Sequence, residues 1–283
     1  MGREHLHLNL ALREVQDYVI DLVGGWIEEL DLKWGRWDYN IWPIVYWEKH
    51  DPSGKFQFRY VEGLYRVLDT LMRRYPDWVV ECCSSGGRRI DLSTLRRAHT
   101  AWFSDHTDNP HVCRYMQTGT SRFLPGNYLN SAVPTRVGEG GCGLSTLDFL
   151  SRMCGTFLLS GDVASWPEEL VRGARQLIEV YKSIRHLLVQ DFYPLTPHPR
   201  SPEDWDVVEF ASYDWLEPVV FFFRVEGDLE ERSFKLRGLA PRETCQVVDP
   251  IDGALVAEAT GEELMERGLT MGLRPSSAAL GHV

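Results

Sequence analysis

The 283-residue sequence lacks the features that mark nucleic-acid-binding and membrane-spanning proteins. Its 30 Lys and Arg residues are outnumbered by 41 Asp and Glu, giving a formal net charge of −11, and they form no continuous basic stripe. Because such a stripe neutralises phosphates, we expect no nucleic-acid partner. No apolar run approaches the ~20 residues of a membrane span, and the opening MGREHLHLNL does not follow the order of a signal peptide. We therefore expect no membrane partner.

Spacings that bind metals or build disulfide frameworks are also missing. The six cysteines include no C-x-x-C pair, and the adjacent Cys82 and Cys83 are poorly placed to bridge each other. The nine histidines include no H-E-x-x-H pair. We expect no metal and no cofactor, and a reducing, cytoplasmic location.

The composition is that of a folded globular protein, with 43% hydrophobic and 25% charged residues. The ten tryptophans leave two interpretations open. They fill the core, which composition alone favours, or they form flat platforms for sugar rings.

Strand and helix patterns alternate through the first two thirds of the chain. Apolar residues at helical spacing predict helices over 15–30, 63–74, 92–97 and 167–188, and apolar runs predict six strands at 5–10, 32–38, 78–83, 100–104, 129–133 and 156–160. Regular alternation of this kind predicts a parallel sheet wrapped by helices. We therefore predict an α/β fold, an incomplete (β/α)8 TIM-type barrel over residues 1–196.

The pattern changes after a Pro-rich stretch, with residues 197–204 as the predicted linker. Short strand-like runs separated by turn residues follow at 207–210, 219–225, 233–236, 246–248 and 255–257. These runs predict an antiparallel β-sandwich domain over residues 205–283.

Two carboxylates, Asp38 and Asp105, each end a predicted strand. Retaining glycosidases place two carboxyl groups ~5–5.5 Å apart, one as nucleophile and the other as acid/base. Alternation along a strand puts Arg36, Asp38 and Asn40 on one face, where the cation would keep a nucleophile ionised. A purely structural pair between Arg36 and Asp38 is the alternative.

Asp105 lies in WFSDHTD (102–108), between Trp102 and Asp108. A general acid must stay protonated near neutral pH, so its pKa must be raised by desolvation or by a nearby negative charge. Trp102 would supply the first and Asp108 the second. The alternative for Asp108 is a helix N-cap ahead of Pro110.

The turn Ser84-Ser85-Gly86-Gly87 ends a further strand. It lacks the G-K-[ST] ending of a phosphate loop, so we interpret its glycines as allowing backbone amides to approach a small ligand. Arg89 and Asp91 follow, and an ion pair between them would support the floor of such a site.

Three segments together resemble glycoside hydrolase family 36, the α-galactosidase or melibiase-like enzymes. RWDYN (36–40) resembles the nucleophile motif K-W-D-x-N, ECCSSGGRRID (81–91) resembles E-x-C-S-S-G-G-G-R-F-D, and WFSDHTD resembles the acid/base motif W-x-S-D-x-T-D. RYMQTGTS (114–121), FLLSGD (157–162) and the tail at 263–280 are similar to the family as well.

The resemblance implies a metal-free retaining hydrolase of terminal α-galactosides. Asp38 would form a covalent galactosyl-enzyme, and Asp105 would be the acid/base. The residues implied around the sugar are Arg36, Trp37, Asn40, Cys83, Ser84, Gly86, Trp102 and Asp108.

The sequence departs from the family pattern in composition and in extent. Arg36 stands where Lys is usual, Cys82 where Asn is common and Arg88 where a third Gly is common. The family also carries an N-terminal β-sandwich and two barrel strands ahead of the matched region, so this chain holds about strands 3–8. The implied partner is a complementing chain or a second copy. The alternatives are a non-catalytic remnant that binds sugar or a partner, a galactosyltransferase and an α-N-acetylgalactosaminidase.

Overall fold

The structure is a computed structural model that describes residues 7–134, 137–138, 141–142, 145–212, 217–274 and 276–283. The chain divides into two compact units, residues 1–102 and 103–283. Each unit is described by itself.

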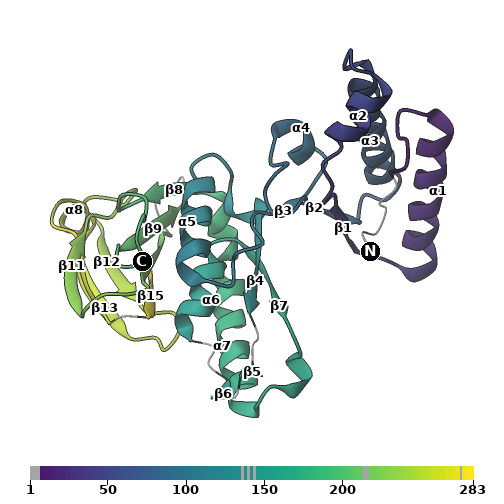
Figure 1. Cartoon of the computed structure of the whole chain (residues 1–283). Coiled ribbons are helices and arrows are strands. Elements are labelled where there is room, and N and C mark those ends of the chain that lie inside the picture. The colour runs from purple at the N-terminus through teal and green to yellow at the C-terminus, as the bar shows by residue number, and fades with distance from the viewer. Residues whose placement is uncertain (1–6, 135–136, 139–140, 143–144, 213–216, 275) are drawn as a thin grey trace. The chain divides into compact units, whose positions relative to one another are not determined.

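The first unit alternates helices with three parallel strands (Figure 1). Its elements are α1 (Arg13–Leu30), β1 (Trp34–Asp38), α2 (Ile44–His50), α3 (Lys55–Arg74), β2 (Val79–Cys83), α4 (Leu92–Leu95) and β3 (Thr100–Trp102). β1 pairs with β2, and β2 pairs with β3, all in parallel. Because parallel strands share a direction, their carboxyl ends meet at one edge of the sheet.

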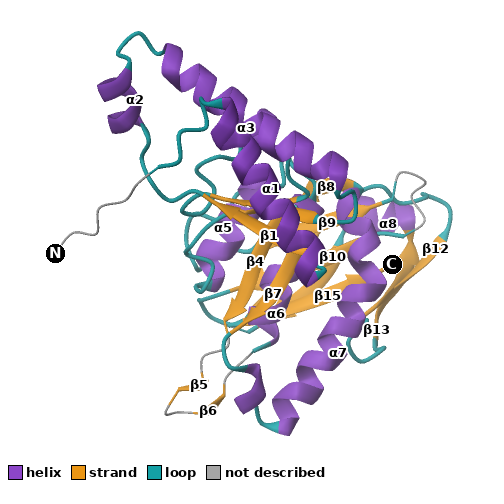
Figure 2. Ribbon diagram, turned by 90° about the vertical axis from the view of Figure 1, so that its right-hand side faces the viewer, coloured by secondary structure: helices purple, strands orange, loops and turns teal. Residues whose placement is uncertain are grey.

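The core of the first unit lies between the sheet and the helices α1 and α3, which pack against each other (Figure 2). Val19 and Ile27 of α1 are buried with Val67 and Leu71 of α3. Gly63 lets α3 approach the backbone of Leu10 closely, because a Cβ at position 63 would lie 1.8 Å from the carbonyl oxygen of Leu10.

The second unit begins with helices and a parallel pair of strands. Its elements before the C-terminal sheets are α5 (Pro110–Thr120), η1 (Gly126–Tyr128), β4 (Leu129–Pro134), β5 (Val137–Gly138), β6 (Gly141–Cys142), α6 (Thr146–Met153), β7 (Thr156–Ser160), η2 (Val163–Ser165), α7 (Glu168–Ile184) and η3 (Arg185–Val189). β4 pairs with β7 in parallel.

Antiparallel strands form the rest of the second unit. They are β8 (Asp191–Pro194), β9 (Asp206–Ala211), β10 (Val219–Arg224), β11 (Glu230–Phe234), β12 (Thr244–Val248), β13 (Leu255–Thr260), β14 (Leu269–Leu273) and β15 (Ser277–His282), with helix α8 (Gly261–Glu266) after β13. The large sheet has the order β13-β12-β15-β10-β9-β8, and β11 pairs with β14 in a second sheet.

Both faces of β9 and β10 are buried, which explains their unbroken apolar runs. On one face, Val207 and Phe222 pack with Phe234 of β11, so that two sheets form a sandwich. On the other face, Phe210 and Phe221 join a core that includes residues of α6 and α7 (Figure 1).

The predicted fold class, an incomplete barrel followed by a β-sandwich, is confirmed, but individual elements differ. Five strands of the described residues run in parallel, three in the first unit and two in the second. The predicted strand at 5–10 is wrong for residues 7–10, while residues 5 and 6 lie outside the described residues. The side chain of Asn9 accepts a hydrogen bond from the Ala11 amide and closes a turn instead.

The C-terminal sheet also begins earlier than the strand-like runs indicate. β8 pairs antiparallel with β9 although it precedes the predicted linker at 197–204. The predicted domain boundaries themselves stay a prediction.

Candidate active site

Asp38 lies at the carboxyl end of β1, on a face that it shares with Trp34 and Arg36. The register places Arg36 beside Glu81 of β2 and Asp38 beside Cys83. Two neighbouring parallel strands therefore place these four residues as two side-by-side pairs, Arg36 with Glu81 and Asp38 with Cys83.

Arg36 pairs with Glu81, which corrects the expected pair between Arg36 and Asp38. Nε donates to Oε2 at 3.1 Å, and Nη2 lies 3.1 Å from Oε1, so the contact is bidentate. Trp34 also donates its Nε1–H to Oε2 of Glu81, at 3.2 Å. The Glu81 side chain is 1% exposed, and that of Arg36 is 36% exposed.

The ring of Trp102, at the end of β3, lies under Arg36, with Cζ 4.6 Å from the ring centroid. A cation over an indole face is held by the ring quadrupole. Arg36 is thus fixed by a carboxylate in its plane and an aromatic ring on its face.

Cys83 brings a thiol to the Asp38 carboxylate. Burial raises the pKa of Cys83 to about 12, and the hydrogen bond to Asp38 and its charge add to the effect. The thiol therefore stays protonated at neutral pH and serves Asp38 as a hydrogen-bond donor.

Asn40 anchors the turn that follows β2. Its Oδ1 accepts hydrogen bonds from the amide of Ser85 at 2.7 Å and from the Ser85 hydroxyl at 3.3 Å. Ser84 donates its hydroxyl to the carbonyl of Tyr39 at 2.6 Å. Ser85 and Gly86 have φ of 44° and 76°, which accounts for the glycine of this turn.

Arg89 and Asp91 do not pair with each other in the described part of the chain. Asp91 caps α4, accepting hydrogen bonds from the amides of Ser93 and Thr94. Arg89 lies over the ring of Tyr39, at 3.8 Å from its centroid. The expected ion pair is therefore wrong, because each partner is committed elsewhere.

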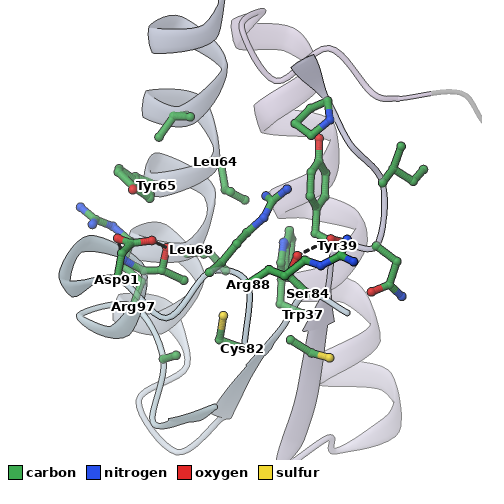
Figure 3. Close-up of a pocket in the computed structure, with 18 of the residues that line it drawn as sticks. Trp37, Tyr39, Leu64, Tyr65, Leu68, Cys82, Ser84, Arg88, Asp91 and Arg97 are labelled. Carbon is green, nitrogen blue, oxygen red and sulfur yellow. Dashed lines mark hydrogen bonds between the residues drawn. The ribbon is translucent and has the colours of Figure 1, made fainter. Parts of the chain in front are cut away.

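A cavity of about 550 Å³ lies on the helix-facing side of these strands (Figure 3). Trp37, Tyr39 and Cys82 line it together with Leu64 and Leu68 of α3. Asn40, Cys83, Ser84, Arg89 and Asp91 also contribute to the lining, whereas Arg36 and Asp38 do not. Because Trp37 alternates with Asp38 and packs against the core of this unit, its ring does not lie on the Asp38 face.

Asp105 and Asp108 belong to the loop that opens the second unit. With His106, Asn109 and Val112 they line a cavity of about 380 Å³. The loop is held from both ends, since Ser104 Oγ accepts from the His106 amide at 3.1 Å and the buried Arg152 donates to the Thr107 carbonyl.

Helix α5 is capped by Asn109, whose side chain accepts a hydrogen bond from the Val112 amide at 3.2 Å. Pro110 occupies the first turn, as expected. The alternative interpretation of Asp108 as the N-cap is therefore wrong by one residue.

Glu81 is the site residue that the sequence analysis missed. Its signal is a single acidic residue in the otherwise apolar strand VVECC, two positions before Cys83 and hence on the same face. Within the described residues, no cluster of three or more His, Cys, Asp or Glu side chains is arranged to bind a metal ion. None of the described helices combines the length and apolarity that crossing a bilayer requires.

Parallel strands with polar side chains at their carboxyl ends, followed by an antiparallel sandwich, define an incomplete (β/α) barrel with an appended β domain. Residues 1–191 match the family model Melibiase. The chain therefore belongs to the Melibiase family.

Relatives and solved structures agree with this family. The chain is 32% identical over 276 residues to "Probable alpha-galactosidase C" of Aspergillus terreus, covering 95% of this chain and 35% of the relative. It is 29% identical over 285 residues to "Alpha-galactosidase AgaA" of Geobacillus stearothermophilus, covering 97% and 38%. A crystal structure of a variant of the GH36 α-galactosidase AgaA in complex with raffinose has a TM-score of 0.83 and 25% identity, covering 100% of this chain and 39% of that one. The chain thus spans about a third of the length of the curated relatives it matches.

Proposed function

We propose that this chain carries the catalytic carboxylates of a retaining glycoside hydrolase that acts on terminal α-galactosides. Membership of the Melibiase family and the names of the similar proteins support the reaction class. The observation that carries the assignment is the position of Asp38 at the carboxyl end of β1. It lies beside the protonated thiol of Cys83 and two residues after Arg36, which Glu81 holds in place.

In the proposed first step, Asp38 attacks the anomeric carbon of the galactosyl unit. The bond from that carbon to the leaving oxygen breaks, and Asp105 gives its proton to that oxygen. In the second step, a water molecule attacks the anomeric carbon, and the Asp105 carboxylate takes a proton from that water. The ester bond to Asp38 breaks, which releases galactose and restores both carboxyl groups.

The other residues take supporting roles in this proposal. Arg36 donates to a sugar hydroxyl, Cys83 donates to Asp38, and Asn40 holds the turn through which Ser84 and Gly86 approach the sugar. Trp102 supports Arg36, and Asp108 adds negative charge near Asp105.

A second polypeptide or a second copy of this chain completes the sugar pocket in this proposal. Five cysteines are free thiols, namely Cys82, Cys83, Cys113, Cys154 and Cys245. Free thiols support the proposed reducing, cytoplasmic location.

The test is covalent trapping with an activated fluorinated α-galactoside, followed by peptide mass spectrometry. We expect one galactosyl adduct on Asp38 and hydrolysis of nitrophenyl α-galactoside that falls at least ~10³-fold in Asp38→Asn. The matched control is Asp77→Asn, an exposed carboxylate ahead of β2, which should keep wild-type turnover.

Both assays are repeated in the presence of a candidate complementing chain. Absence of an adduct and of turnover in every mixture would contradict the proposal and favour a remnant that only binds sugar or a partner. Product analysis with sucrose present separates hydrolysis from galactosyl transfer, and an acetamido substrate separates α-N-acetylgalactosaminidase activity.

A further inference from the structure

Glu81 is a buried acidic residue that the proposed mechanism does not use. Its carboxylate is 1% exposed and accepts hydrogen bonds from Nε of Arg36 and Nε1 of Trp34. Moving a carboxylate out of water is energetically unfavourable, and an apolar side chain in this strand would avoid that desolvation. Stability alone therefore does not explain an acidic residue at this position.

The geometry of the pair leaves part of Arg36 available. Glu81 occupies the Nε and Nη2 edge of the guanidinium group. Among the described residues, none accepts a hydrogen bond from Nη1 of Arg36, and the side chain is 36% exposed. Arginine presents its donors in a rigid planar fork, so fixing one edge also fixes the direction of the other.

Arg36 lies within reach of a ligand on Asp38. Two residues along a strand are separated by about 6.6 Å, and Arg36 and Asp38 face the same side. This spacing is comparable to the width of a pyranose ring, so a sugar whose anomeric carbon contacts Asp38 can extend toward Arg36. The ring of Trp102 closes the face of the guanidinium and limits its rotation.

We propose that Glu81 is a positioning residue, which holds Arg36 so that its free Nη1 edge donates to a hydroxyl of the sugar bound at Asp38. This inference rests on the proposed function. It adds that Glu81 acts on the sugar only through Arg36, with Trp34 and Trp102 completing the support.

The test is a double-mutant cycle of Glu81→Gln and Arg36→Gln, with kcat and KM measured on nitrophenyl α-galactoside. Glu81→Gln keeps the volume but removes the charge and one acceptor. We expect kcat/KM to fall roughly 10- to 100-fold in the wild-type background and less than about 2-fold when Arg36 is already Gln. Glu81→Asp, which keeps the charge, should recover part of the loss.

The matched control is Asp69→Asn, which breaks the ion pair with Arg97 in the same unit. It should leave kcat/KM unchanged. Thermal unfolding of every variant identifies those that fail to fold, and the double variant, which has no buried charge to pair, keeps the cycle measurable. An equal loss from Glu81→Gln in both backgrounds would overturn the proposal, because Glu81 would then act independently of Arg36.

A second readout does not depend on turnover. The Nε–Hε NMR signal of Arg36 should be protected from solvent exchange, and it should shift when galactose is added. Both features should disappear in Glu81→Gln. If the wild type shows no turnover, the proposed hydrolase function fails, yet a galactose-dependent shift that requires Glu81 still supports the positioning role. No shift in the wild type would overturn it.

Discussion

Two arginine–carboxylate pairs, one in each unit, use the same chemistry in different ways. In the second unit, Arg114 and Asp206 have exposed fractions of 1% and 3%. The donors of Arg114 go to Asp206, Gln117, Thr118 and the carbonyl of Ser151.

In the first unit, Arg36 gives only one edge to Glu81 and keeps Nη1 without a partner in the described residues. Four of the five N–H donors of Arg114 are thus bound within the second unit and the side chain is buried, so this arginine stabilises the fold and is not exposed to a ligand. An arginine fixed on one edge and open on the other can also bind. The comparison therefore separates a structural ion pair from one suited to recognition, although both join an arginine to a buried carboxylate.

The largest expected effect comes from breaking the buried ion pair between Arg114 and Asp206. Asp206→Asn leaves the charge of Arg114 buried and unpaired, so the free energy of unfolding should fall by about 3–5 kcal/mol. Urea denaturation followed by circular dichroism measures this change. Asp31→Asn, at an exposed pair with Lys33, is the control and should leave the midpoint unchanged. A midpoint for Asp206→Asn equal to that of the wild type would remove the distinction between the two pairs.

Glu209 sharpens the comparison because it is a buried carboxylate that forms no salt bridge within the described residues, although the charge of Arg237 acts on it. Burial raises the pKa of Glu209 from 4.5 to about 8, while Oε2 accepts from the amide of Arg237 at 2.8 Å. The folded protein therefore binds this proton more tightly than the unfolded chain. Its stabilising effect is complete below the unfolded pKa and is lost as the pH rises through the folded pKa.

The free energy of unfolding should thus fall by about 1.4 kcal/mol per pH unit, or about 3 kcal/mol between about pH 5.5 and 7.5. Glu209→Gln should abolish this slope in urea titrations at several pH values. Glu258→Gln, on the exposed face of β13, should retain it. A wild-type curve that is flat over this pH range would contradict the assignment.

The smallest expected effect concerns Asn40, two residues after the end of β1. Asn40→Ala removes the acceptor of the Ser85 amide and should lower the free energy of unfolding by about 1 kcal/mol. Asn40→Asp keeps an oxygen acceptor and should stay close to the wild type. Calorimetric melting of the three proteins measures the difference, and equal melting of Asn40→Ala and Asn40→Asp would show that the hydrogen bond contributes little.

Periodicity and strand-end residues predicted most of the barrel elements, because each is determined locally. Helix α1 and strands β1, β2, β4 and β7 lie where apolar spacing placed them. Helix α2 was missed because it is only seven residues long, and β8 was missed because its residues precede a Pro-rich stretch that reads as a linker.

The site was harder to predict because it depends on which residues meet across strands. Arg36 is two positions from Asp38 in the sequence, which suggested a pair, but the register gives it Glu81 from the next strand. Asp91 likewise accepts hydrogen bonds from the amides of Ser93 and Thr94 at the start of α4 and does not pair with Arg89 among the described residues. Local sequence predicts the face of a side chain but not its partner across the sheet.

The pairing of β8 with β9 has a practical consequence for dividing the gene. A fragment beginning at residue 205 would be synthesised without the edge strand of its large sheet. It would also expose Phe210, Phe221 and Phe223, which α6 and α7 cover in the folded chain. A fragment meant to keep this sheet folded should therefore start at residue 103, so that the helices remain with the sheet they protect from self-association.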